Sequence, residues 1–190
     1  MKKIAQLALL LALVLGAFQS ANAALLLEPQ VGFSLGSKLD FKDGEKYSGG
    51  MGLSYGGRVG YQNMGLQLGL DYLASSVDMD DKDFKSNVKT SEWAAFAGFR
   101  FPILVKVYAG YIFSATGDSK VDVLGSSQNL DLSNGSGYKL GVGYTLLPFV
   151  DLNLEYRQGT YGEYKVGGTK IKEDVNFSSY LLSVSLPFTI

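Results

Sequence analysis

Apolar and polar residues alternate along much of this chain with a period of two. The clearest example is the stretch 137–157, where two alternating runs flank the tripeptide Leu147-Pro148-Phe149. A period of two places one set of side chains on each face of a β-sheet. One face of this hairpin is apolar and rich in tyrosine, whereas the other is small, polar or charged. The pattern predicts two amphipathic strands joined by a short turn.

Eight alternating segments of this kind can be followed along the chain. They exceed the about five or six residues that are usual for soluble strands, and they suit tilted membrane-spanning strands of about 9–11 residues. The segments cover residues 25–37, 50–61, 64–74, 92–102, 105–115, 137–146, 150–157 and 177–190.

The connections between these segments alternate in length. Three are tight, at Gln62-Asn63, 102–104 and 147–149. Four are long and polar, at 38–49, 75–91, 116–135 and 159–176. Outer-membrane barrels have short periplasmic turns and long external loops. The chain is therefore predicted to be all-β, as an eight-stranded antiparallel up-and-down transmembrane β-barrel in the cell outer membrane.

Residues 1–23 have the pattern of a secretory signal peptide. Lys2 and Lys3 precede an apolar run, and Ala21-Asn22-Ala23 forms a small-residue cleavage site. The apolar run is shorter than the about 20 residues that a spanning helix needs, which disfavours an uncleaved anchor. We expect cleavage after Ala23 and one barrel domain over residues 24–190.

Charged residues in the strands share one parity, opposite to the apolar face. A Lys or Arg that faces lipid at mid-depth costs about 2–4 kcal/mol, and the interior of an eight-stranded barrel is just wide enough for side chains to fill. Buried charges have to be paired, so we expect a salt-bridged lumen instead of an open channel. The predicted layers are Glu28, Arg100, Lys106 and Asp151 near the periplasmic end, Arg58, Asp71 and Glu155 in the middle, and Glu92, Lys139 and Arg157 nearer the external loops.

The apolar face indicates whether it packs in a protein core or faces lipid. A soluble sandwich would also place all charges on one face, toward water. The apolar face, however, carries aromatic residues on nearly every strand, and many lie near strand ends, such as Tyr61, Trp93, Phe101 and Phe188. Aromatic girdles of this kind mark the two membrane interfaces. The aromatic pattern favours an apolar face that contacts lipid.

With these features the chain resembles the OmpA/OmpX-like outer-membrane β-barrel domain family over residues 25–190. The unit Gly141-Val142-Gly143-Tyr144 followed by Leu152-x-Leu154-x-Tyr156 carries the resemblance, together with the eight strands and the charged lumen. It implies contact with outer-membrane lipid and lipopolysaccharide and assembly by the barrel-assembly machinery. Barrels of this family usually end in Phe, whereas this chain ends in Phe188-Thr189-Ile190. We expect the barrel alone, without a peptidoglycan-binding domain after Ile190.

The chemistry that the sequence lacks limits its function. There is no histidine and no cysteine, and the net charge is −1. Known barrel enzymes use a catalytic histidine as base, so we expect no enzymatic activity, no cofactor and no transition-metal site. The mild charge gives no case for nucleic-acid binding. The acidic run at 78–83 could hold calcium loosely, but a solvated loop tip is the favoured interpretation.

The sequence thus predicts a non-enzymatic outer-membrane barrel with a structural or surface role, a salt-bridged lumen and four external loops whose partner it does not identify. Two alternatives stay open. One is a small porin-like channel, and the other is a soluble, lipocalin-like ligand-binding barrel in the periplasm.

Overall fold

The computed structural model describes residues 24–41, 46–81, 84–123, 126–166 and 168–190. The expected signal peptide and its cleavage site at Ala23 lie outside the described residues, as does the tip of the acidic run at 78–83. Among the residues that the structure describes, no helix is long and apolar enough to cross a membrane.

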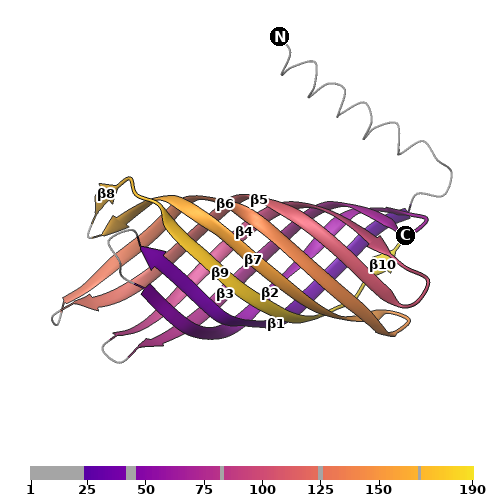
Figure 1. The fold of residues 1–190 in the computed structure, drawn as a ribbon, viewed down its shortest axis with the longest axis horizontal. Helices are drawn as coiled ribbons and strands as arrows, with labels where there is room; N and C mark the ends of the chain where they lie inside the picture. The colour runs from indigo at the N-terminus through magenta and orange to yellow at the C-terminus, as the bar shows by residue number, and fades with distance from the viewer. Residues whose placement is uncertain (1–23, 42–45, 82–83, 124–125, 167) are drawn as a thin grey trace, which may run out of the picture.

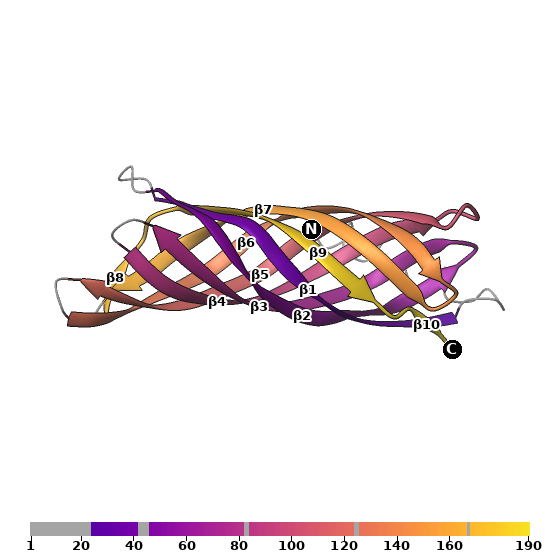
Figure 2. The same cartoon turned by 90° about the horizontal axis from the view of Figure 1, so that it is seen from below.

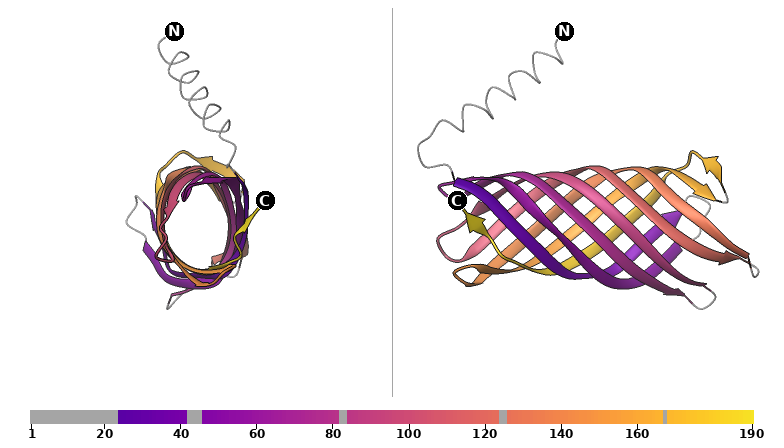
Figure 3. Two further views of the ribbon diagram at one scale, coloured as in Figure 1. Left: turned by 90° about the vertical axis from the view of Figure 1, so that its right-hand side faces the viewer. Right: turned by 180° about the vertical axis from the view of Figure 1, so that it is seen from behind.

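The described chain forms one closed antiparallel sheet (Figure 1). Each long strand pairs with the next along the chain, and β9 pairs with both β7 and β1 (Figure 2). Viewed along its axis, the barrel has an oval outline (Figure 3). The strands are β1 (Ala24–Phe41), β2 (Lys46–Asn63), β3 (Leu66–Asp81), β4 (Phe84–Arg100), β5 (Val105–Val123), β6 (Ser126–Leu147), β7 (Val150–Val166), β8 (Thr169–Ile171), β9 (Val175–Ser185) and β10 (Phe188–Thr189).

β9 and β10 together make the eighth strand of the barrel. β10 continues the pairing with β1 at Leu26 and Leu27. Beyond it, Ile190 and Leu25 exchange two backbone hydrogen bonds of 2.8 and 3.0 Å. The short β8 only prolongs the hairpin that follows β7. The predicted eight-stranded up-and-down barrel is confirmed.

The four connections predicted as long loops are largely strand. β3 and β4 pair as far as Asp81 and Phe84, and β5 and β6 pair as far as Val123 and Ser126. The hairpins therefore project from one end of the barrel, opposite to the end where β10 lies (Figure 1). These four connections were predicted as loops because their composition is polar, whereas a strand inside a membrane needs an apolar outer face. Outside the membrane the same backbone pairing is stable with a polar outer face.

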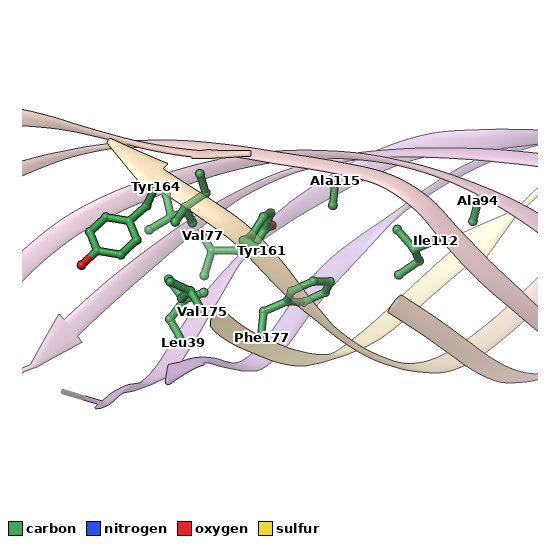
Figure 4. Close-up of a cluster of buried hydrophobic side chains, with 11 residues drawn as sticks. Leu39, Val77, Ala94, Ile112, Ala115, Tyr161, Tyr164, Val175 and Phe177 are labelled. Carbon is green, nitrogen blue, oxygen red and sulfur yellow. The ribbon is translucent and has the colours of Figure 1, made fainter. Parts of the chain in front are cut away.

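Bulges turn several apolar side chains into the lumen. In β1 the pairing register shifts between Ser34 and Lys38, around Gly36, whose φ is +58°. Beyond this shift Leu39 faces inward and is buried. The result is an apolar cluster inside the external half of the barrel (Figure 4), which the sequence did not predict. It comprises Leu39, Val77, Val88, Ala94, Ile112, Ala115, Leu132, Tyr161, Tyr164, Val175 and Phe177.

The first periplasmic turn differs from its predicted position. β2 ends at Asn63, so the turn consists of Met64 and Gly65 instead of Gln62 and Asn63. Both turn residues have positive φ, +48° for Met64 and +88° for Gly65, as in a type I′ turn. The register thus places a residue with poor left-handed propensity at the first turn position. The other two tight turns lie within one residue of their predicted positions.

Substituting Met64 with asparagine is expected to raise the free energy of unfolding by about 1 kcal/mol, because asparagine tolerates a left-handed backbone better. The Met64 side chain is 87% exposed, so little packing is lost. Equilibrium urea unfolding in lipid vesicles measures the effect. The neighbouring Gly65→Ala variant should do the opposite, because a Cβ there would lie 2.5 Å from the Arg100 carbonyl oxygen. Equal effects of the two variants would contradict the turn assignment.

Candidate functional site

The middle of the lumen carries ten charged side chains from seven consecutive strands. They point inward because successive side chains of a strand point to opposite faces, and the alternate positions of the same strands carry the apolar side chains exposed on the outer surface. All are buried except Arg100, whose side chain is 19% exposed at the periplasmic end. The ten are Glu28 (β1), Arg58 (β2), Asp71 (β3), Glu92 and Arg100 (β4), Lys106 (β5), Lys139 (β6), and Asp151, Glu155 and Arg157 (β7).

Arg58 lies at the centre of this group. Its Nε donates to Asp71 Oδ2 at 2.7 Å, and its two terminal nitrogens donate to Glu28 at 3.4 Å and Glu155 at 3.1 Å. The guanidinium carbon also lies 4.0 Å from the ring centroid of Tyr108. The planar guanidinium carries several N–H donors and can hydrogen-bond to several carboxylates at the same time. The face of an aromatic ring attracts the positive charge of the guanidinium. One arginine therefore joins three strands across the lumen.

The periplasmic layer is held by Lys106 and Arg100. Lys106 Nζ hydrogen-bonds to Glu28 and lies 2.8 Å from Asp151 Oδ2. Arg100 donates two hydrogen bonds to the same Asp151 carboxylate, from Nη1 to Oδ1 at 3.2 Å and from Nη2 to Oδ2 at 2.6 Å. The Thr145 hydroxyl adds a further hydrogen bond of 2.7 Å to that carboxylate. Asp151, which is fully buried, is therefore neutralised by two cations.

The external layer is held by Lys139 and Arg157. Lys139 Nζ lies 2.5 Å from Asp71 Oδ2 and 3.3 Å from Glu155 Oε2. Arg157 hydrogen-bonds to Glu92 and places its Nε 3.1 Å from Glu155 Oε1. Each carboxylate in this layer thus faces at least one cation.

These contacts join all ten side chains into one network, here called the lumen network. It runs from Arg100 at the periplasmic end to Glu92 beneath the apolar cluster. Lys139 and Glu28, which were predicted for the two outer layers, both bond with residues of the predicted middle layer. The expected salt-bridged interior is present. The individual pairings and the contact of Tyr108 with Arg58 were not predicted.

Glycines on β6 give the network its space. A Cβ at Gly141 would lie 2.2 Å from the Tyr108 ring, and a Cβ at Gly143 would lie 2.6 Å from the Lys106 stem. The missing side chains let Tyr108 and Lys106 lie against the wall of the barrel. Phe96 of β4 also points inward and lies 5.6 Å from the Arg58 guanidinium. Its position opposite to the apolar face was a sequence signal of an aromatic contact in the lumen, as was the inward parity of Tyr108 on β5.

A group of buried polar atoms beside the network has no hydrogen-bond partner among the described residues. It includes both amide atoms of Gln30, the Ser183 hydroxyl and the Asn153 side-chain oxygen. The residues lie on β1, β7 and β9, and β9 pairs with both of the other strands. Buried polar atoms of this kind are normally satisfied by ordered water. This corner of the lumen is therefore suited to hold buried water.

Little space remains inside the barrel near the top of the network. A cavity of about 40 Å³ is lined by Glu92 and Arg157 of the network and by Tyr161 and Phe177 of the apolar cluster, among others. Such a volume suits water and not a substrate. Across the described ranges, no group of three or more His, Cys, Asp or Glu side chains is arranged to hold a metal ion.

The external hairpin of β7 and β8 has its own ion pair. Lys170 Nζ lies 2.6 Å from Glu163 Oε1, and Ser133 and Asn134 each lie 3.3 Å from the same carboxylate. The hydrogen bond from Lys170 holds the pKa of Glu163 below its ordinary value. Because the Lys170 side chain is half exposed, this pair contributes little to stability.

Comparisons with known proteins agree with this architecture. The family model described as outer membrane protein beta-barrel domain matches residues 8–188. A search of curated protein sequences finds no match. The structure of Neisserial surface protein A is similar, with 22% identity, a TM-score of 0.60 and coverage of 88% of this chain and 99% of that chain. The attachment invasion locus protein Ail of Yersinia pestis gives 14% identity, a TM-score of 0.61 and coverage of 86% and 98%.

The two structural likenesses establish the fold only, whereas the family model covers most of the chain. Large apolar side chains are exposed on the outer surface of every long strand, such as Phe33 on β1, Leu140 on β6 and Leu154 on β7. Together with this apolar band, the family match places the protein in the outer membrane and excludes the soluble lipocalin-like alternative. The chain belongs to the outer-membrane β-barrel domain family.

Proposed function

We propose that the protein is a non-conducting, non-enzymatic surface protein whose barrel anchors external hairpins in the outer membrane. The filled lumen carries this proposal. The lumen network neutralises every inward charge of the membrane-spanning strands, and the apolar cluster covers it on the external side. An ion that crossed the barrel would have to displace buried salt bridges and then pass an apolar layer, and both steps are costly.

The external hairpins are suited to contact a partner. They continue the barrel as paired strands, so their outer surfaces are held by backbone hydrogen bonds. Their outward side chains include a row of charges at neighbouring positions of adjacent strands. In the strand register Lys89 lies opposite Asp118, and Asp131 lies opposite Lys165. An ordered surface loses little conformational entropy on binding, which favours recognition.

The side-chain chemistry supports a non-enzymatic role. The chain has no histidine or cysteine. Its buried carboxylates and cations bond to one another inside the lumen, where a substrate cannot reach them. General acid–base catalysis requires a titratable group within hydrogen-bond reach of the substrate.

Planar-bilayer recordings test the proposal. The purified protein should give no steady conductance, under conditions in which an added porin conducts. The charge-balanced variant Glu28→Ala with Lys106→Ala should also be silent, because the apolar cluster remains above the shortened network. Steady conductance from the wild-type protein would favour the small porin-like channel and overturn the proposal.

A further inference from the structure

The outer wall formed by β5, β6, β7 and β9 changes its chemistry from row to row. Residues that pair across strands form rows on this surface, and each row lies two residues further toward the external end than the last. The first row is Ala109, Leu140, Tyr156 and Tyr180. The second row is Tyr111, Tyr138, Gln158 and Ser178. The third row, which begins on β6, is Ser136, Thr160 and Asn176, and it ends at Asp40 of β1.

The lower part of this wall has an apolar hollow of about 710 Å³. Ala97 of β4 pairs with Ala109 of β5, so two small side chains lie side by side in the lipid-facing surface. Larger side chains, including Phe99 and Leu140, surround them. Its depth within the apolar band and its apolar lining suit a hydrocarbon chain.

The upper part of the wall has a second hollow, of about 510 Å³. Side chains of the second and third rows line it, and most are uncharged amides, hydroxyls and tyrosines. Tyr156 lines both hollows, so the two adjoin along the wall. An apolar hollow at membrane depth that adjoins a polar hollow nearer the external side matches the shape of an amphiphile aligned with the membrane.

Hydrogen bonds orient the polar groups of the upper hollow. The Tyr156 hydroxyl donates to Gln158 Oε1 at 3.1 Å, and the Thr160 hydroxyl donates to Asn176 Oδ1 at 2.8 Å. Both amide oxygens are thus engaged, and the amide nitrogens are the groups of these two side chains that can donate to a ligand. Amide N–H groups beside tyrosine rings suit sugars, which offer hydroxyl acceptors and apolar ring faces.

Another outer hollow shows that this composition is not shared by the whole external surface. A hollow of about 480 Å³ on β4, β5 and β6 is lined by Asn87, Lys89, Asp118, Ser119, Asn129 and Asp131. Three of its lining side chains are charged, and it lacks tyrosine. Sugar rings therefore fit the upper hollow of the β5–β9 wall better than this charged hollow.

We propose that the wall of β5, β6, β7 and β9, together with the adjoining part of β4, binds one glycolipid molecule of the outer leaflet. An acyl chain lies in the lower hollow against Ala97 and Ala109. The headgroup sugars lie in the upper hollow, where Gln158 and Asn176 donate hydrogen bonds to them and the tyrosine rings border them. This site is separate from the lumen and from the tips of the hairpins.

Glycolipid retention measures the site directly. The purified protein is exchanged into phosphatidylcholine vesicles that contain rough lipopolysaccharide, re-extracted gently, and analysed by native mass spectrometry. The double variant Gln158→Ala with Asn176→Ala should retain about tenfold less lipopolysaccharide than wild type, as expected for two lost hydrogen bonds. The matched control, Asn87→Ala with Ser91→Ala, changes outward polar residues on β4 and should retain the wild-type amount. Heat-shift gels verify that both variants form closed barrels.

A second arm replaces rough lipopolysaccharide with phosphatidylglycerol, which has acyl chains and a phosphate but no sugar ring. Wild type should retain less phosphatidylglycerol than lipopolysaccharide, and the double variant should retain as much phosphatidylglycerol as wild type. Equal retention of lipopolysaccharide by wild type and double variant would overturn the proposal. An equal loss in the control variant, or equal retention of phosphatidylglycerol and rough lipopolysaccharide by wild type, would overturn it as well.

Discussion

Replacing Arg58 with alanine is expected to lower the free energy of unfolding of the barrel by about 3–5 kcal/mol. Arg58 contacts three carboxylates in the lumen, and all of them are at least 98% buried. Without it, Lys106 and Lys139 remain the nearest cations, and the buried negative charge exceeds the positive charge. The single tryptophan, Trp93, faces outward and reports unfolding by its fluorescence during urea titration in vesicles.

The control for this prediction is Lys170→Ala. Lys170 also forms an ion pair, with Glu163, but its side chain is 49% exposed, so its loss should change the free energy of unfolding far less than the loss of Arg58. Adding Asp71→Asn to an Arg58→Met variant should recover part of the lost stability, because it removes one unpaired buried charge. Similar small losses for Arg58→Ala and Lys170→Ala would mean that the lumen charges are loosely hydrated and not bonded into a network.

The inward direction of the charges could be predicted because it depends on local chemistry. The pleat of a strand gives a period of two, and lipid excludes charge from one face. Each strand therefore reveals its orientation without reference to the others. Asp71 and Lys139, for instance, were placed in the lumen from their own strands alone, 68 residues apart in the chain.

The pairings could not be predicted in the same way. Arg58 on β2 reaches Glu155 on β7, two strands that do not pair with each other. Such a contact depends on how the closed barrel brings its walls together, which follows from the stagger of all the strands. The central position of Tyr108 depends equally on Gly141 of the adjacent strand, which leaves room for the ring.

The apolar cluster was missed for two reasons: bulges change the direction of some side chains, and other members lie at ordinary inward positions of stretches that were predicted as loops. Leu39 fell in a predicted loop, and one register shift near Gly36 gives it an inward direction, opposite to the one that the alternation of β1 before the shift would give. Tyr161 and Phe177 lie in or next to a stretch whose polar composition suggested a loop. A bulge has no composition signal as strong as alternation, although a residue such as Gly36 with positive φ is a common element of one.

Replacing Tyr161 with alanine is expected to lower the free energy of unfolding by about 3–5 kcal/mol, the range for large aromatic side chains in packed cores. Tyr161 is 1% exposed, and its ring centroid lies 5.0 Å from that of Phe177. The loss leaves a cavity that the closed wall cannot fill. Urea unfolding in vesicles, again followed through Trp93, measures the change.

Tyr55→Ala provides the matched control, because Tyr55 lies on β2 and its side chain is 59% exposed on the outer surface. Its loss should cost less than half as much as the loss of Tyr161. Equal costs would mean that the interior cluster is no better packed than the outer surface. The Tyr161→Ala barrel should still be silent in planar bilayers, because the lumen network below the cavity remains intact. Conductance from that variant would instead identify the apolar cluster as the main barrier to ions.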